Sequence, residues 1–173
     1  LYQAIELGKS DEEIEEIAND YDYLEIQPIG NNEFLVRNGV VKDDEALKDI
    51  NRKIVALGEK LNKLVVATCD VHFMDPQDEV YRRILEAGQG YKDADNQAPL
   101  YLRTTNEMLD EFKYLGEEKA YEVVVTNTNK VADMCEQISP ISQEKCPPHI
   151  PGCEQTIKDI AYDRAHKLYG EVL

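Results

Sequence analysis

Short apolar runs alternate along the chain with longer amphipathic stretches, which is the pattern of strands interleaved with helices. Residues 64–67 form a continuously apolar, mostly β-branched run, typical of a strand that is covered on both faces in a parallel sheet. Residues 21–27 alternate polar and apolar side chains and predict an earlier strand. Between them, residues 43–60 repeat apolar side chains every three or four positions, which predicts a helix. The order therefore predicts a βαβ unit with two parallel strands and a right-handed crossover.

Capping signals indicate where further helices begin. Ser10 and Thr104 each stand three residues before a glutamate, the spacing of a capping box. Asp75 followed by Pro76 gives an N-cap with proline at the first helical position, and residues 117–137 predict a long helix. The positions expected to face a core are Ile14, Ile17, Leu47, Ile50, Ile54, Leu57, Leu61, Val80, Ile84, Leu85, Met108, Leu109, Phe112, Ala120, Val123, Val124, Val131 and Met134, and, in a final helix over residues 156–169, Ile157, Ile160, Ala161, Ala165 and Leu168.

The main candidate for chemistry directly follows the apolar run at residues 64–67. Asp70 and His72 stand two positions apart, and in an extended segment such side chains point the same way, so they could reach one metal ion at the carboxyl end of a strand. The alternatives are an aspartate that caps the next helix and a histidine with a structural role. Zinc and manganese centres need three or more protein ligands, so the others must come from elsewhere. Glu25 and Gln27 could line the same pocket, but we expect them to orient loops.

Other chemistry-bearing residues are weaker candidates. Cys146, His149 and Cys153 lie in a proline-rich stretch that lacks the paired Cys-x-x-Cys spacing of structural sites, so zinc is not expected there. His166 lies in the predicted final helix and is expected to face solvent. The sequence contains no glycine-rich phosphate loop, nucleophile elbow or zincin motif.

Composition narrows the possible classes. A chain of 173 residues with 42% apolar and 31% charged residues can bury one sizeable core. The formal net charge of −16 repels phosphate backbones, which makes this segment by itself a poor binder of DNA or RNA. Four scattered cysteines, no signal peptide and no run of membrane-spanning length predict a cytoplasmic protein with free thiols. The chain opens in what looks like the inside of an element, without an initiator Met, so we expect a piece of a longer protein.

Six stretches of sequence occur in an informative order: YDYLEIQP (21–28), VATCDVHF (66–73), DPQD (75–78), YRRIL (81–85), RTTNEML (103–109) and YLGEEKA (114–120). Together they resemble the PHP (polymerase and histidinol phosphatase) domain of the PolC-type catalytic α subunits of bacterial DNA polymerase III. The similarity runs from about Leu1 to Leu173, and the order of the motifs makes it specific.

The resemblance implies an α/β fold class: part of a distorted (β/α) barrel of PHP type, with parallel strands and flanking helices, followed by a mainly helical C-terminal segment. It assigns residues 1–100 to the second part of the PHP domain and residues 101–173 to a helical segment leading toward the polymerase palm. Asp70 and His72 match the last ligand motif of a cluster of up to three divalent metals (Mn, Zn or Mg). The earlier ligands find no counterpart, as expected for a chain that begins after the exonuclease insertion of these enzymes. Cys69 stands where a smaller or amide residue is expected, and packing is its expected role.

The function implied is that of a fragment of the replicative DNA polymerase III α subunit, whose parent transfers deoxynucleotides onto a primer end. This segment would supply two metal ligands and scaffold, and is expected to be inactive alone. Other domains of the parent would bind DNA and deoxynucleotides, replisome subunits are possible partners, and uncovered strand edges favour self-association of the fragment. Two alternatives stay open: a metal-dependent PHP phosphoesterase, and a non-catalytic docking module whose acidic surface meets a basic replisome subunit.

Overall fold

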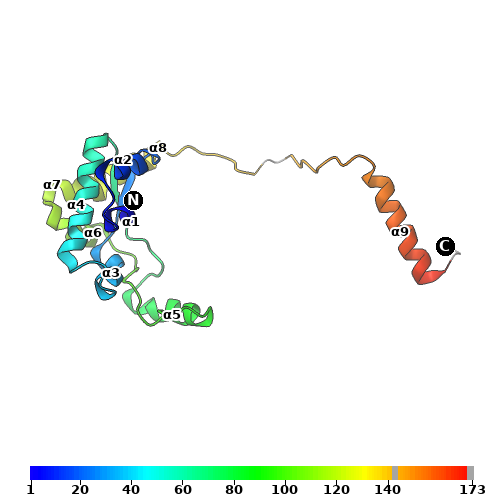
Figure 1. Ribbon diagram of the computed structural model, residues 1–173, viewed down its shortest axis with the longest axis horizontal. Helices are drawn as coiled ribbons and strands as arrows, with labels where there is room; N and C mark the ends of the chain where they lie inside the picture. Colours follow the sequence, from blue (N-terminus) through cyan, green and yellow to red (C-terminus); the bar gives the residue numbers. More distant parts are fainter. Residues whose placement is uncertain (142–143, 171–173) are drawn as a thin grey trace. The chain divides into compact units, whose positions relative to one another are not determined.

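The computed structural model describes residues 1–141 and 144–170, and the chain divides into two compact units, Leu1–Glu136 and Gln137–Leu173 (Figure 1). The first unit is mixed α/β, mostly helical, and contains a small parallel sheet. The second unit contains one helix among its described residues, α9 (Cys153–Tyr169). The separation of a PHP part from a helical segment at residue 100 is a different division and stays a prediction.

A helix and two parallel strands form the centre of the first unit. Strand β1 (Leu24–Ile26) pairs with β2 (Val65–Ala67) in the register Leu24–Val65 to Ile26–Ala67, and α4 (Asp44–Leu61) connects them. The predicted parallel βαβ arrangement is therefore confirmed, although β1 is shorter than the alternating stretch at residues 21–27. The described residues form one two-stranded parallel sheet, and the PHP-type barrel that the resemblance implied stays a prediction.

Helix α4 owes its position to its caps and its apolar face. The Asp43 carboxylate accepts a hydrogen bond from Ala46 N at 3.0 Å, and Asn62 ends the helix in the left-handed conformation. Close contact with the sheet is possible because position 58 is glycine: a Cβ there would lie 2.3 Å from Val65 Cγ2. The buried residues of this helix are Leu47, Ile50, Asn51, Ile54, Val55, Leu57 and Gly58.

The remaining elements of the first unit surround this centre. Both predicted capping boxes are present, at Ser10 with Glu13 and at Thr104 with Glu107. The predicted long helix at residues 117–137 is instead two α-helices joined by a π-helical turn, and it ends at Met134. The elements are α1 (Tyr2–Glu6), α2 (Asp11–Asn19), the 3₁₀ turn η1 (Ile29–Asn32), α3 (Glu33–Arg37), the 3₁₀ turn η2 (Pro76–Asp78), α5 (Glu79–Gly88), α6 (Thr105–Phe112), the 3₁₀ turn η3 (Lys113–Leu115), α7 (Glu117–Tyr121), the π turn η4 (Glu122–Thr126) and α8 (Asn127–Met134).

The core contains most of the side chains that the periodicity placed there. Ile14, Ile54, Phe112 and Val123 are each at most 1% exposed. They belong to one cluster that also holds the inward residues of both strands. Hydrophobic periodicity was a sound guide wherever a helix lies against the sheet or against another helix.

Two predicted inward faces, those of α5 and α9, are wrong, and so is one inward position of the helix predicted at residues 117–137. In α5, Ile84 and Leu85 are 62% and 66% exposed, and Met134 of α8 is 61% exposed. In α9, Ile157, Ile160 and Leu168 are exposed, and none of the helix's residues is buried. An amphipathic pattern specifies a face whose burial would stabilise the protein, but it does not supply the partner that buries this face. The described residues of each unit provide no such cover.

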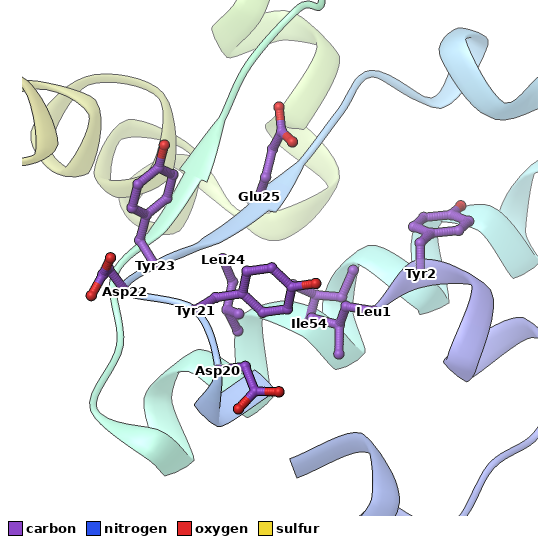
Figure 2. A pocket seen from close by; sticks show the side chains of 9 residues that line it. All are labelled: Leu1, Tyr2, Asp20, Tyr21, Asp22, Tyr23, Leu24, Glu25 and Ile54. Atoms are coloured by element: carbon purple, nitrogen blue, oxygen red, sulfur yellow. The ribbon is translucent and has the colours of Figure 1, made fainter. Parts of the chain in front are cut away.

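A cleft of about 520 Å³ opens beside the start of β1 (Figure 2). Tyrosine and acidic side chains share its lining with Leu1, Leu24 and Ile54. Burial raises the pKa of Tyr2 to about 12, and the Tyr2 hydroxyl is buried without a hydrogen-bond partner in the structure. Of the polar residues predicted for the site, only Glu25 lines this cleft.

The close approach of α4 to the sheet predicts opposite effects for two glycine-to-alanine substitutions. Alanine favours a helix over glycine by about 1 kcal/mol, so Gly88→Ala in α5, where a Cβ meets nothing within 4 Å, is expected to stabilise the chain slightly. Gly58→Ala is expected to destabilise it by about 2 kcal/mol, because the new methyl group collides with Val65. Urea denaturation followed by circular dichroism measures both changes, and a Gly58→Ala variant at least as stable as wild type would contradict this packing.

Candidate functional site

The backbone adopts a left-handed conformation at Asp70, three residues after the end of β2. This residue has φ +51°, in the left-handed region that only Asn62 shares among the described non-glycine residues. The prediction that Asp70 and His72 meet because their segment is extended is therefore wrong. A side chain in the left-handed region costs roughly 1–2 kcal/mol, although aspartate tolerates it better than most residues, so this conformation marks Asp70 as a candidate for function.

The His72 ring nevertheless lies close to Asp70. His72 Nδ1 lies 2.9 Å from the backbone oxygen of Asp70 and 3.8 Å from Asp70 Oδ1. A carbonyl oxygen can only accept, so Nδ1 carries the proton and the lone pair of the neutral ring is on Nε2. Both side chains are close to half exposed, at 46% for Asp70 and 43% for His72. A carboxylate and an imidazole nitrogen are thus both accessible from solvent.

Backbone hydrogen bonds hold the His72 segment against a second segment. Leu100 O accepts from His72 N at 2.8 Å and from Phe73 N at 3.3 Å, and Leu102 N donates to Phe73 O at 3.0 Å. Phe73 and Tyr101 form an isolated parallel bridge. The position of His72 therefore depends on residues about thirty positions later in the chain.

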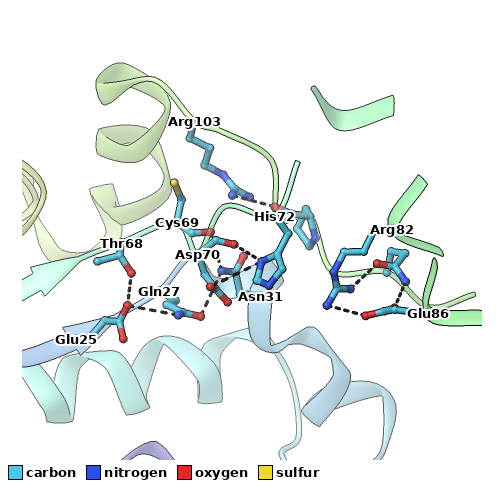
Figure 3. Close-up of polar contacts among 12 residues, drawn as sticks. Glu25, Gln27, Asn31, Thr68, Cys69, Asp70, His72, Arg82, Glu86 and Arg103 are labelled. Atoms are coloured by element: carbon cyan, nitrogen blue, oxygen red, sulfur yellow. Dashed lines mark hydrogen bonds and ion pairs between the residues drawn. The ribbon is translucent and has the colours of Figure 1, made fainter. Parts of the chain in front are cut away.

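A polar network joins the carboxyl ends of β1 and β2 (Figure 3). Asn31 Nδ2 donates to Cys69 O at 3.2 Å and to Gln27 Oε1 at 3.3 Å, which fixes the loop just before Asp70. The Glu25 carboxylate accepts from the Thr68 hydroxyl and, at 3.5 Å, from Gln27 Nε2. These contacts agree with the expectation that Glu25 and Gln27 orient loops.

Asp70 also lines a cleft of about 290 Å³ together with residues of η1, α3, α5 and the loop after α5. Arg37 and Arg82 reach this cleft, which Glu25 and Gln27 do not line. Arg82 is already paired, because its Nη2 lies 2.8 Å from Glu86 Oε1 and its Nη1 donates to Gln97 Oε1 at 2.6 Å. The cleft therefore combines four carboxylates, those of Glu33, Asp70, Glu86 and Asp93, with the side chains of Arg37 and Arg82.

Asp70 and His72 fit a metal ion only as part of a larger donor set. Among residues 1–141 and 144–170, no group of three or more His, Cys, Asp or Glu side chains could hold a metal ion. The ring nitrogen of His72 that faces Asp70 is Nδ1, and it carries the proton. His72 would therefore bind an ion through Nε2. The pair can supply two ligands, and the remaining ligands would have to come from other polypeptide.

The other candidate residues are cysteines and histidines outside this pair. The four cysteines are free, and Cys69 is half-buried and packs against the core, in line with its expected packing role. His166 is exposed as predicted, and its Nδ1 lies 3.1 Å from Gly170 O. Cys146 and His149 are exposed in the second unit.

Asn31 is the site residue that sequence reasoning missed. It stands in a Gly-Asn-Asn stretch that reads as a strand breaker, yet it is only 8% exposed and bonds across to the loop before Asp70. An asparagine directly after a predicted strand, on the same edge as Asp70, was the available signal.

The geometry is that of an α/β segment with candidate metal ligands beyond the carboxyl end of a parallel strand, and comparison with known proteins identifies its relatives as DNA polymerases. The chain is 60% identical over 173 residues to DNA polymerase III PolC-type of Clostridium perfringens, and 56% identical over 173 residues to that of Caldanaerobacter subterraneus. It is 48% identical over 170 residues to DNA polymerase III PolC-type of Bacillus subtilis. All or nearly all of this chain is covered, but it spans only about 12% of the length of each relative.

The chain is therefore a homologue of a segment of PolC-type DNA polymerase III, and the resemblance found in its motifs is confirmed. No family model matches it. Within the described part of the chain, every helix is too short or too polar to cross a bilayer.

The left-handed conformation of Asp70 predicts which of two substitutions at position 70 gives the more stable chain. Asp70→Gly removes the carboxylate and relaxes the backbone, whereas Asp70→Ala removes the same carboxylate and keeps a Cβ at φ +51°. We expect Asp70→Ala to be less stable than Asp70→Gly by about 1 kcal/mol in urea denaturation. The same pair of substitutions at Asn62, with φ +53°, is the matched control and should give the same sign. Equal stabilities at position 70 with a difference at position 62 would mean that Asp70 is not in this conformation.

Proposed function

We propose that this chain is the PHP portion of a PolC-type DNA polymerase III α subunit and that it supplies two metal ligands, Asp70 and His72, together with the scaffold that carries them. The observation that carries the proposal is identity of 43–60% to PolC-type polymerases over essentially the whole chain. The position of Asp70 and His72 beyond the carboxyl end of β2, with both side chains close to half exposed, supports their role. Residues 1–100 are the second part of the PHP domain in this proposal, and residues 101–173 lead toward the palm.

The two ligands suit a divalent ion. A carboxylate oxygen and an imidazole nitrogen are ligands for Mn and Zn, and the carboxylate alone also suits Mg. When bound, such an ion supplies positive charge that can neutralise phosphate oxygens and acidify water. The residues of this chain contribute the orientation: Asn31 holds the backbone before Asp70, and the Nδ1–H···O contact leaves Nε2 of His72 free to bind.

The activity of the parent is DNA-directed DNA synthesis in the cytoplasm, with DNA and deoxynucleotides bound by its other parts. The net charge of −16 supports DNA binding by other parts of the parent, because a surface so acidic does not attract a phosphate backbone. Two protein ligands bind an ion weakly, so this segment alone should neither polymerise nor hydrolyse.

Manganese should reveal the proposed ligands by paramagnetic broadening. The chain has three histidines, and we expect the His72 imidazole signals to broaden at lower Mn²⁺ concentration than those of His149 and His166, which are internal controls. Asp70→Asn should raise the concentration needed to broaden His72 by about tenfold, because one ligand loses its charge. Equal broadening of all three histidines would contradict the assignment of Asp70 and His72.

The purified chain with added Mn²⁺ should show no primer extension, no nuclease activity and no phosphatase activity. Turnover by the chain that disappears in Asp70→Ala would instead support the alternative of a metal-dependent PHP phosphoesterase.

A second candidate function is docking, favoured by the acidic surplus of the chain, 35 acidic against 19 basic residues. In this role the segment would bind a basic subunit of the replication machinery. Capture of such a subunit should then fall steeply as ionic strength rises. Capture that is insensitive to salt would count against docking through charge.

A further inference from the structure

One charged side chain is buried among the described residues of the first unit, and it belongs to the segment that holds His72. Arg103 is 7% exposed as a residue and its side chain is 2% exposed. The other buried polar residues are asparagines. Burying a guanidinium costs free energy unless its N–H groups have hydrogen-bond partners. The contacts of Arg103 therefore indicate which parts of the chain it stabilises.

The guanidinium makes three contacts. Its Nη1 donates to Pro99 O at 2.9 Å, and its Nε lies 3.2 Å from Glu111 Oε1. Its central carbon lies 4.3 Å from the centroid of the Tyr101 ring, a cation–π distance. The Arg103 side chain thus contacts both ends of the segment from Pro99 to Tyr101.

That short segment is the support of the His72 loop. Leu100, between the two contacted residues, accepts the backbone hydrogen bonds of His72 and Phe73, and Tyr101 forms the bridge with Phe73. The other end of the connection is firm, because Glu111 belongs to α6, whose Met108 and Phe112 are 6% and 0% exposed in the core. Arg103 therefore links α6 to the segment that supports the His72 loop. Arg103 and His72 are both drawn in Figure 3.

We propose that Arg103 is a positioning residue for the His72 site: it orders the Pro99–Tyr101 segment, and this segment orders His72. The proposal deepens the proposed function, on which its relevance to metal binding rests, while its structural part can be tested without metal. The geometry requires arginine in particular, because a planar fork with several donors can stack on Tyr101 while it donates to two acceptors. A lysine ammonium cannot do all three.

The test is residue-resolved amide hydrogen exchange on the full chain. In Arg103→Met we expect the His72 and Phe73 amides to exchange about tenfold faster, since a local opening loses the support of their acceptor. The amides of α4 should exchange at the wild-type rate. Arg103→Lys should recover only part of the protection, and Arg83→Met, which removes an arginine from the i, i+4 pair with Glu79 on α5, should leave His72 and Phe73 unchanged.

Two outcomes would overturn the proposal. One is unchanged exchange at His72 and Phe73 in a folded Arg103→Met. The other is an equal acceleration in α4, which means that Arg103 stabilises the whole unit instead of this loop. If Arg103→Met does not fold, Arg103→Lys decides by the same comparison of His72 with α4.

Manganese broadening separates this proposal from the proposed function. In Arg103→Met the preference of Mn²⁺ for His72 over His149 and His166 should weaken. If Mn²⁺ shows no preference for His72 in the wild-type chain, the metal-ligand role of His72 is wrong. The hydrogen-exchange result still tests the role of Arg103 in that case. Conversely, wild-type exchange of the His72 and Phe73 amides in Arg103→Met, together with preferential broadening of His72 in the wild-type chain, would contradict only the role of Arg103.

Discussion

The contact between α4 and the parallel pair β1–β2 is the constraint on which the first unit depends. Gly58 allows the helix to approach Val65 closely, and the apolar face of α4 covers the strands. Asn51, on the same buried face, donates to Gln27 O at 3.1 Å and to the Tyr114 hydroxyl at 2.8 Å, so the helix also holds the residue after β1. This packing fixes the points at which the two strands end, and the loops of the candidate site begin at those points.

Precision at the candidate site comes from neighbours and not from the two candidate ligands. Asn31 fixes the backbone before Asp70, while the segment around Leu100 fixes His72 from the other side. Both supports are anchored in buried parts of the unit, although Asp70 and His72 themselves are close to half exposed. Exposed candidate ligands on a fixed backbone are compatible with the proposed site, whose remaining ligands would come from other polypeptide.

The apolar faces of α5 and α9 have a different meaning from those of α4 and α6. Ile84, Leu85 and Ile157 lie outside any core although their helices have the amphipathic pattern of packed ones. The described residues of each unit leave these faces exposed. Uncovered apolar faces are also the feature that favours self-association of the isolated chain.

The sequence by itself determined the parallel βαβ centre, the capped starts of α2 and α6, and the relationship to PolC-type polymerases, because local periodicity, capping chemistry and motif order are written along the chain. Only the tertiary structure decided that Asp70 adopts a left-handed conformation, that Asn31 bonds to the loop before it, that Arg103 is buried and donates to Pro99, and that the described residues leave the apolar face of α5 exposed. The physical reason is distance along the chain. Asn31 and Cys69 are 38 positions apart, and His72 meets Leu100 only after the chain has folded back, so no local pattern encodes these contacts.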